Sequence, residues 1–202
     1  LFRILVAQES GITDIEDLKG VEVGISEGTV IAYLTDRLLE AEGFSADEIA
    51  TIAVPKIPDR MALLDSGELQ AAMLPDPASS LAIMNGATLI IDDTRHPELG
   101  LSVFSFRKEV IDANPEAIRA FLAAVEQAVV EINADPDRYA DLMAEKGLVP
   151  APLVGSYQVN PLPTANVPSQ AQWDDAVAWA LSNGLINDEI SYDESVTGDF
   201  LP

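Results

Sequence analysis

Four small and polar residues, Ser26 to Thr29, stand between two different apolar patterns. Residues 21–25 alternate apolar with small or polar side chains, which is typical of a strand, whereas from Val30 the apolar positions lie one helical turn apart. A strand that enters a helix through such a turn leaves backbone N–H groups unpaired beside the positive end of the helix dipole, where small anionic groups bind. The turn is therefore a candidate ligand-binding loop, with simple helix capping by Ser26 or Thr29 as the alternative.

A second candidate is the Pro75-Asp76-Pro77 segment, which directly follows an apolar run at residues 71–74. Open α/β sheets bind their ligands at the carboxyl ends of their strands, so Asp76 could accept hydrogen bonds from a ligand amine or ring N–H. The alternative is that Asp76 caps a helix whose first position is Pro77. Gln8 and Ser10, next to the apolar run at residues 2–7, are further candidates.

These candidates lie within a predicted α/β unit. Short apolar runs alternate with helical patterns of about ten residues, as in βαβ units. Residues 18–93 are therefore expected to form a parallel-rich sheet with helices on both faces. Beyond them, residues 101–106 alternate as a strand would, and the pattern from Pro115 to Ile132 predicts the longest helix of the chain.

Composition excludes several classes of function. The net charge of −23, from 34 acidic and 11 basic residues among 202, argues against nucleic acid as a partner, because few cations are available to neutralise phosphates. The chain has no cysteine and one histidine, His96, so neither a thiolate nor a transition-metal site is expected. No metal site, cofactor or catalytic dyad is predicted. No apolar run of 18 residues and no export signal is visible within the chain.

Several short segments, taken in order, resemble one family. They are Ser10-Gly-Ile12, Asp17-Leu-Lys-Gly20, Val23-Gly-Ile-Ser-Glu-Gly-Thr29, Leu64-Asp-Ser-Gly-Glu-Leu-Gln-Ala-Ala72, Asn114-Pro115 and Trp179-Ala-Leu-Ser-Asn-Gly-Leu-Ile186. Together, over about residues 8–195, they resemble the extracytoplasmic substrate-binding proteins of ABC importers for nitrate, sulfonates, taurine and thiamine precursors.

The resemblance implies a type II periplasmic-binding-protein fold, in which two α/β lobes enclose the ligand in a cleft. Residues 20–96 would form one complete, parallel-rich second lobe. Residues 1–19 and 97–202 would supply the remainder of a truncated first lobe, with hinge strands near residues 2–7 and 101–106 and the C-terminal helices. About ninety residues of the family's first lobe have no counterpart here, which puts capture by closure of two lobes in question.

In the family, the loop that matches residues 26–29 faces the cleft. By that resemblance, Gly28 allows the ligand to approach the backbone, and Ser26 and Thr29 donate hydroxyl hydrogens to it. Glu27 would repel a dianion but suit a ligand that carries an amine, or it points to solvent. Tyr157, in a proline-rich connection, is a weaker candidate for ligand contact.

The function that this implies is non-enzymatic. The protein would be the solute-binding component of an ABC importer, with a small polar ligand (sulfonate, nitrate, taurine or pyrimidine-like) and a membrane permease as partners, located in the periplasm or at the cell surface. Since Leu1 is not a start methionine, a processed precursor with a signal or lipid anchor is compatible with this expectation. The alternatives are an enzyme like the thiamine pyrimidine-precursor synthases, or the ligand-sensing domain of a longer regulator.

Overall fold

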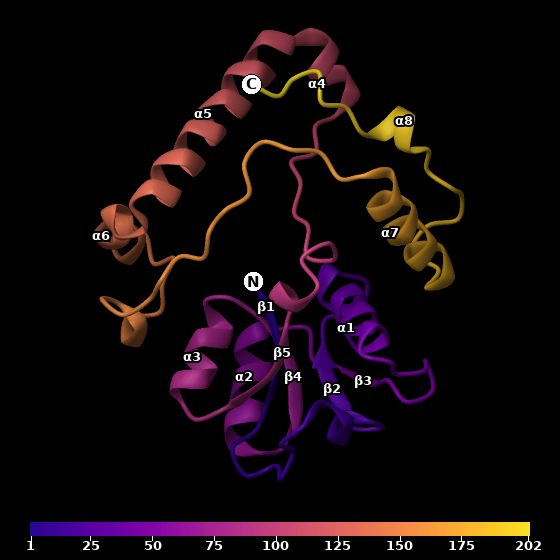
Figure 1. The fold of residues 1–202 in the computed structure, drawn as a ribbon, viewed down its shortest axis with the longest axis vertical. Coiled ribbons are helices and arrows are strands. Elements are labelled where there is room, and N and C mark those ends of the chain that lie inside the picture. Colours follow the sequence, from indigo (N-terminus) through magenta and orange to yellow (C-terminus); the bar gives the residue numbers. More distant parts are fainter.

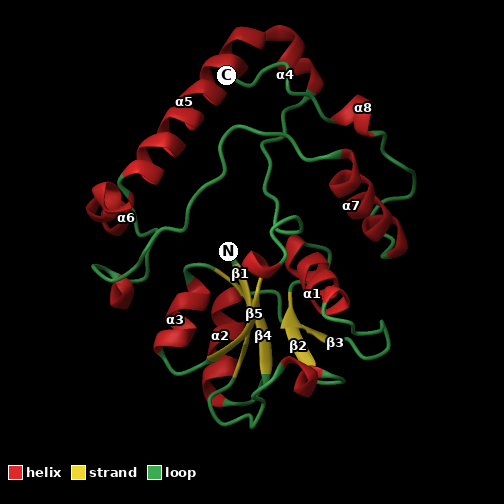
Figure 2. Ribbon diagram, in the orientation of Figure 1, coloured by secondary structure: helices red, strands yellow, loops and turns green.

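A five-stranded sheet organises residues 1–96 of the computed structural model, which describes all 202 residues. The strands are β1 (Phe2–Val6), β2 (Glu22–Ile25), β3 (Ala50–Ala53), β4 (Ala71–Pro75) and β5 (Thr88–Asp92). Between them lie the short 3₁₀ turn η1 (Ile15–Leu18) and the helices α1 (Val30–Ala41), α2 (Ile57–Ser66) and α3 (Ala78–Met84), and a second 3₁₀ turn, η2 (Asp93–Arg95), follows β5. Figure 1 shows this unit below a separate arch of helices, and Figure 2 shows that all five strands belong to it.

The strand order is β3-β2-β4-β1-β5, and one strand runs against the others. β2 pairs in parallel with β3 and β4, whereas β1 lies antiparallel between β4 and β5. The carboxyl ends of β2 and β4 therefore share an edge of the sheet with the start of β1. Residues 1–19, which the sequence analysis grouped with residues 97–202, pack here instead, because β1 is a central strand and Leu18 is buried in its core.

Helices cover both faces of this sheet, as the sequence predicted. Alternate residues of one strand serve opposite faces: Ile4 and Val6 pack with α1, whereas Leu5 packs with α2 and α3. The first core is the larger and also holds Leu34 and Leu38 of α1. The expected α/β lobe is thus confirmed, but its sheet is mixed: two of the four strand pairings are antiparallel, because β1 runs against both of its neighbours.

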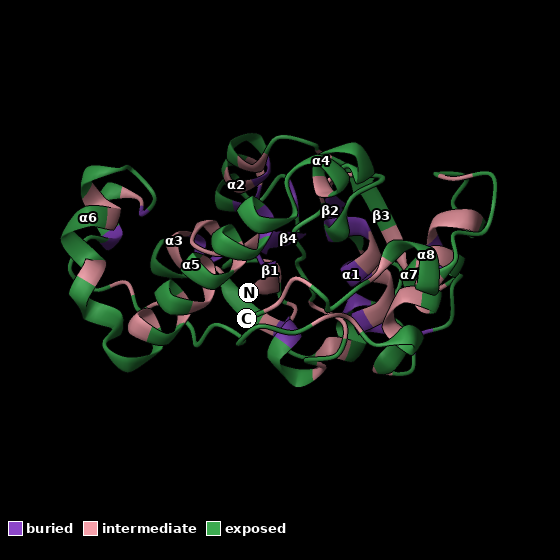
Figure 3. Ribbon diagram, turned by 90° about the horizontal axis from the view of Figure 1, so that it is seen from above, coloured by how far each residue is buried: buried purple, intermediate pink, exposed green.

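The remaining residues form an open arch of helices. Its elements are α4 (Lys108–Ala113), α5 (Pro115–Ala134), η3 (Pro136–Tyr139), α6 (Ala140–Glu145), η4 (Ala151–Leu153), α7 (Gln170–Ser182) and α8 (Tyr192–Ser195). Figure 3 shows that α4 to α6 are mostly exposed. The predicted strand at residues 101–106 is wrong: this segment is irregular and almost wholly exposed, because no neighbouring strand lies there to pair with it. No helix combines the length and the apolar character that a membrane span requires.

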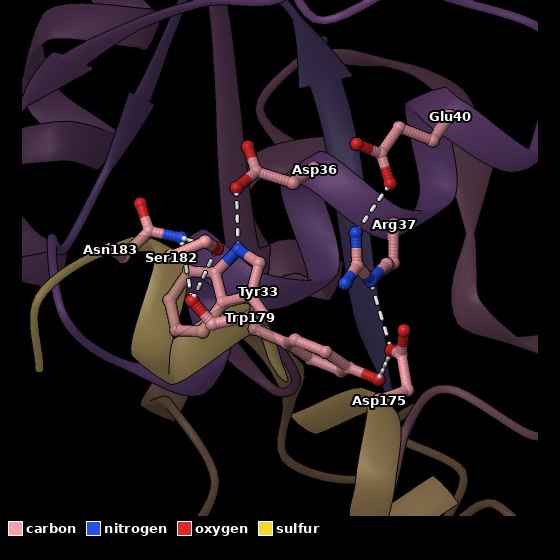
Figure 4. A network of polar contacts seen from close by, with 8 residues as sticks. All are labelled: Tyr33, Asp36, Arg37, Glu40, Asp175, Trp179, Ser182 and Asn183. Atoms are coloured by element: carbon pink, nitrogen blue, oxygen red, sulfur yellow. Dashed lines mark hydrogen bonds and ion pairs between the residues drawn. The ribbon is translucent and has the colours of Figure 1, made fainter. Parts of the chain in front are cut away.

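One end of the arch is anchored to the sheet unit through α1 and α7 (Figure 4). Trp179 donates its indole N–H to Asp36 Oδ2 at 2.7 Å, and its ring meets Tyr33 edge-on with centroids 5.5 Å apart. Asp175 accepts hydrogen bonds from the Tyr33 hydroxyl at 2.7 Å and from Arg37 Nε at 2.9 Å. Burial, and then the bond to Asp175, raises the pKa of Tyr33 to about 12. These contacts fix α7 beside the candidate loop.

Candidate functional site

The loop of residues 26–29 lies where the sequence predicted it, between β2 and α1. Thr29 is the N-cap residue of α1: its Oγ1 accepts a hydrogen bond from the Ile31 N–H at 3.1 Å and donates one to the Ser26 carbonyl at 2.7 Å. The capping alternative therefore describes Thr29 correctly. Since its hydroxyl hydrogen is already used within the loop, Thr29 does not offer it to a ligand, contrary to the expectation from the sequence.

Ser26 is likewise engaged within the protein. Its Oγ donates to the Pro55 carbonyl at 2.9 Å and accepts a hydrogen bond from Arg60 Nη2 at 2.5 Å. The predicted role of Ser26 as a hydroxyl donor to the ligand is therefore not supported by this geometry. Its hydroxyl instead ties the end of β2 to the segment between β3 and α2.

The donors that remain free in this loop belong to the backbone. The N–H groups of Glu27, Gly28 and Thr29 make no hydrogen bond within the protein, and all three residues are exposed. Gly28 has φ +65°, a conformation that side chains other than glycine rarely adopt. Leu185, just beyond α7, lies against it, since a Cβ at Gly28 would be 3.2 Å from Leu185 Cδ2. The Glu27 side chain makes no hydrogen bond or ion pair.

Sequence reasoning missed Arg60, the charged residue that organises this corner. Its side chain is fully buried, and its guanidinium donates to the carbonyls of Val54 and Met73 as well as to Ser26. Burial lowers the pKa of Arg60, although an arginine stays charged. The signal that could have found it is its spacing, since Arg60 stands four residues before the buried Leu64 and so shares the inward face of α2.

Asp76 lies at the same edge of the sheet, at the end of the neighbouring strand β4. Its Oδ1 forms an ion pair with Arg3 Nη1 at 2.9 Å and also accepts from the hydroxyls of Ser79 and Ser80. Its Oδ2 accepts from the Tyr157 hydroxyl at 2.9 Å and the Asn160 amide at 3.4 Å. Five donors occupy the roughly four lone-pair positions of a carboxylate, so a ligand could bind Asp76 only by displacing some of them.

The protonation of this network follows from the same contacts. Burial alone would raise the pKa of Asp76, but hydrogen bonds from Ser80 and Tyr157, together with Arg3, outweigh burial and lower it. Burial and the bond to Asp76 raise the pKa of Tyr157 to about 12, so this phenol stays protonated at neutral pH. The alternative that Asp76 caps α3 is wrong, because Pro77 occupies the N-cap position and no side chain caps that helix.

The structure separates Gln8 and Ser10 from the other candidates. Both follow β1, which runs antiparallel, so they lie at the opposite edge of the sheet: Ala7 N bonds to the Gln70 carbonyl just before β4. Gln8 lines a small cavity with α2 and α3 residues, and Ser10 Oγ accepts from the Ile12 N–H at 3.2 Å. Neither residue belongs with the loop and Asp76. Tyr157, by contrast, joins Asp76 to the helical arch.

A second hollow of about 540 Å³ lies along the arch, away from the candidate loop. Its lining is mainly apolar and comes from α5, η3, α6 and two connecting segments; it includes Ile132, Tyr139, Leu142, Met143 and Leu148. It contains none of the predicted site residues.

Comparison with known proteins gives related sequences and the same fold. An Escherichia coli (strain K12) protein that is named for binding aliphatic sulfonates is 27% identical over 170 residues, which cover 84% of this chain and 53% of that protein. This chain spans about half the length of the curated relatives it matches, all of which are named as binding proteins.

Solved structures agree on the architecture. The periplasmic aliphatic sulphonate binding protein SsuA from Escherichia coli superimposes with a TM-score of 0.78 at 24% identity, over 96% of this chain and 68% of that one. The desulfurization enzyme DSZB superimposes with a TM-score of 0.70 at 16% identity, over 98% of this chain and 74% of that one. The fold is therefore that of the type II periplasmic binding proteins.

A family model described as NMT1/THI5 like matches residues 1–139, more than half of the chain. That span includes the sheet, the candidate loop, Arg60 and Asp76. The chain belongs to the NMT1/THI5-like family.

Proposed function

We propose that this chain is a ligand-binding part of the solute-binding component of an ABC importer, and that its ligand is a small organic anion such as a sulfonate. The observation that carries the proposal is the row of unpaired backbone N–H groups at Glu27, Gly28 and Thr29, held at the carboxyl ends of the parallel strands β2, β3 and β4 of a mixed sheet. The names of the relatives support the sulfonate class, because the matched E. coli protein is named for it.

Charge at this edge favours an anion over an amine. Arg3, Lys56 and Arg60 are three of only eleven basic residues, and all three lie at or next to the ends of β2, β3 and β4 or the start of β1. Asp76 balances Arg3, but no carboxylate lies within 4 Å of the charged groups of Lys56 or Arg60. In a chain of net charge −23, these cations favour an anion at this corner, although Glu27 and Asp59, in the first turn of α2, offset part of their charge.

Capture by closure needs a second wall for the ligand, and we propose that an α/β segment equivalent to the unmatched part of the relatives supplies it. The arch supports this proposal, since twelve of the seventeen exposed large apolar side chains belong to residues 97–202. Phe104, Phe121 and Val130 are each at least 44% exposed, and the apolar hollow along α5 and α6 continues the same surface. Such a surface is typical of a face that another unit covers. The ligand would bias the closed form, which docks on a membrane permease.

The enzyme alternative has weaker support. The likeness to DSZB at 16% identity concerns the fold. The chain offers no cysteine, and the ring of its single histidine, His96, pairs with Glu42 at 2.8 Å instead of facing the candidate loop. We therefore infer a binding protein that delivers its ligand unchanged, in the periplasm or at the cell surface.

Calorimetric titration of the 202-residue chain tests the ligand class. Ethanesulfonate, taurine, nitrate and an uncharged sulfone of the same shape as ethanesulfonate would be compared at low salt. We expect binding with a dissociation constant of about 1 mM or weaker, since one wall of a cleft supplies a few kcal/mol (about 4 kcal/mol at 1 mM). Ethanesulfonate should bind more tightly than the sulfone. Equal binding of the two, or no binding of any anion, would contradict the proposal.

A further inference from the structure

Arg60 differs from every other basic residue of the chain in its surroundings. Seven of the eleven basic side chains lie within 4 Å of a carboxylate; the four that do not are Lys56, Arg60, Arg107 and Arg119. Among these four, Arg60 alone is buried, with no exposed surface, whereas Lys56 is exposed. Burial of a charge without a counter-charge is costly, so its retention at this position calls for a compensating interaction.

The compensation visible in the protein is partial. The guanidinium donates to the Val54 carbonyl at 2.9 and 3.1 Å, to the Met73 carbonyl at 2.5 Å and to Ser26 Oγ. These acceptors are dipoles just beyond the carboxyl ends of β3 and β2 and in the middle of β4, and they satisfy the hydrogen bonds without cancelling the charge. One unit of positive charge is left over next to Ser26, the residue that begins the candidate loop.

The sequence also makes room for this side chain. A Cβ at Gly24 in β2 would lie 3.3 Å from Arg60 Cγ and 2.5 Å from Leu69 Cδ2, so glycine is required there for Arg60 and Leu69 to approach the strand. A lysine in place of Arg60 would keep the charge, but it lacks the planar guanidinium that binds acceptors from three neighbouring strands at once. The guanidinium thus positions the loop as well as charging it.

We propose that Arg60 is the positioning and specificity residue of the loop of residues 26–29: it fixes Ser26 and leaves one unbalanced positive charge beside the free N–H groups, so that the corner selects anions over neutral molecules of the same shape. This inference rests on the proposed function for the location of the ligand. It assigns the selectivity to Arg60 instead of to the exposed Lys56 at the same edge.

The experiment measures the local potential without any ligand. Since the chain has no cysteine, Glu27→Cys places a single thiol in the loop, and Gln8→Cys places one at the opposite edge as a reference. Each thiol is treated with two methanethiosulfonate reagents, one carrying a sulfonate and one carrying a trimethylammonium group. The measured quantity is the ratio of the anionic to the cationic reaction rate at residue 27, divided by the same ratio at residue 8.

We expect this normalised ratio to exceed one. It should fall about threefold or more when Arg60→Met is added, because removal of one positive charge at roughly 10 Å slows the reaction of the anionic reagent and speeds that of the cationic one. The ratio should also shrink at high salt. Arg60→Lys should keep most of the ratio, and Lys56→Met should change it less than Arg60→Met does. Circular dichroism confirms that each variant is folded, and Arg60→Gln, which retains donors for the Val54 and Met73 carbonyls, serves if Arg60→Met does not fold.

Three results would overturn the inference: a normalised ratio near one, a larger loss with Lys56→Met than with the neutral Arg60 variants, or an equal loss with Arg60→Lys and Arg60→Met, which would make the role purely structural. The outcome is independent of ligand binding. A chain that binds no sulfonate but shows the Arg60-dependent ratio contradicts the proposed function alone, whereas a chain that binds sulfonate without that ratio contradicts this inference alone.

Discussion

Residues 1–96 and residues 97–202 are similar in length but bury very different numbers of side chains. Four of the thirty buried residues lie beyond residue 96, namely Ile118, Val149, Leu153 and Trp179, and the other 26 lie before it. The first region encloses two cores around one sheet, whereas α5 carries an apolar stripe of which Ile118 alone is buried. The first region therefore has two hydrophobic cores around its sheet, whereas the second carries most of the exposed large apolar side chains, as our proposal of a covering α/β segment expects.

The largest expected difference between the two regions is in amide hydrogen exchange. Amides of β1 and β4, central in the sheet, should exchange through global unfolding, whereas amides in the middle of α5 should exchange through local opening. Protection in β1 should therefore exceed that in α5 by about 10³-fold or more. Mass spectrometry of peptides from the two regions measures this directly. Equal protection would break the comparison, because it would show that the arch is as well supported as the sheet.

Substitution of one apolar residue in each region should lower the free energy of unfolding much more in residues 1–96 than in residues 97–202. Leu34→Ala, at a fully buried position of α1, should lower the free energy of unfolding by about 2–5 kcal/mol. Phe121→Ala, at a position that is 44% exposed, removes a larger side chain but should cost less than about 1 kcal/mol. Urea unfolding monitored by circular dichroism gives both values. A cost for Phe121→Ala that equals or exceeds that of Leu34→Ala would contradict the account.

Asp76 contacts residues of both regions, so its replacement should destabilise both. Asp76→Asn leaves Arg3 without its partner and weakens the bonds from Tyr157 and Asn160, and we expect a loss of about 2–4 kcal/mol in the free energy of unfolding. Exchange should also accelerate around residues 151–160. A surface variant, Glu109→Gln, serves as the control and should change neither quantity.

The same contact predicts a dependence on pH. Because the folded protein holds the pKa of Asp76 below its ordinary value, the stabilisation is fully present at pH values above the unfolded pKa of about 4 and is lost as the pH falls through the lower, folded pKa. The wild-type chain should lose stability over this window more steeply than Asp76→Asn does. Parallel slopes for the two proteins in acid would show that Asp76 is not favourably paired.

A smaller effect than that of Asp76→Asn is expected at the anchored end of the arch. Trp179→Phe removes the indole donor to Asp36 while keeping an aromatic ring next to Tyr33, and should cost about 1–2 kcal/mol. Tryptophan fluorescence of the remaining Trp173 and urea unfolding measure it. Tyr33→Phe, which loses a single bond to Asp175, is the matched variant and should cost less. A larger loss for Tyr33→Phe would place the main anchor at Asp175 instead of Asp36.

The sequence predicted the sheet unit well, because alternating strands and capped helices leave a local signal. It failed where the outcome depends on neighbours in space. Residues 101–106 alternate like a strand but find no partner strand. Gln8 and Ser10 lie at the edge of the sheet opposite to the candidate loop, because β1 runs antiparallel to β4. That direction cannot be deduced from the residues of β1 alone.

The site shows the same division between local and tertiary information. The turn of residues 26–29, with its cap and its left-handed Gly28, follows from local spacing. The engagement of Ser26 by Arg60, 34 positions away, and of Asp76 by Tyr157, 81 positions away, arises from the assembled fold. These two long-range contacts occupy Ser26 and Asp76, and the local bond from Thr29 to the Ser26 carbonyl occupies the other predicted hydroxyl donor. The proposed binding element is therefore the row of free backbone N–H groups at residues 27–29.

The most direct test of this account is an amide-resolved NMR titration of the 202-residue chain with ethanesulfonate, repeated with Gly28→Val, which strains the φ of +65° and crowds Leu185. The account predicts saturable shifts that are largest at the amides of Glu27, Gly28 and Thr29 and that Gly28→Val abolishes, with little change at Gln8 and Ser10. Saturable shifts centred elsewhere, or shifts at residues 27–29 that survive Gly28→Val unchanged, would contradict it.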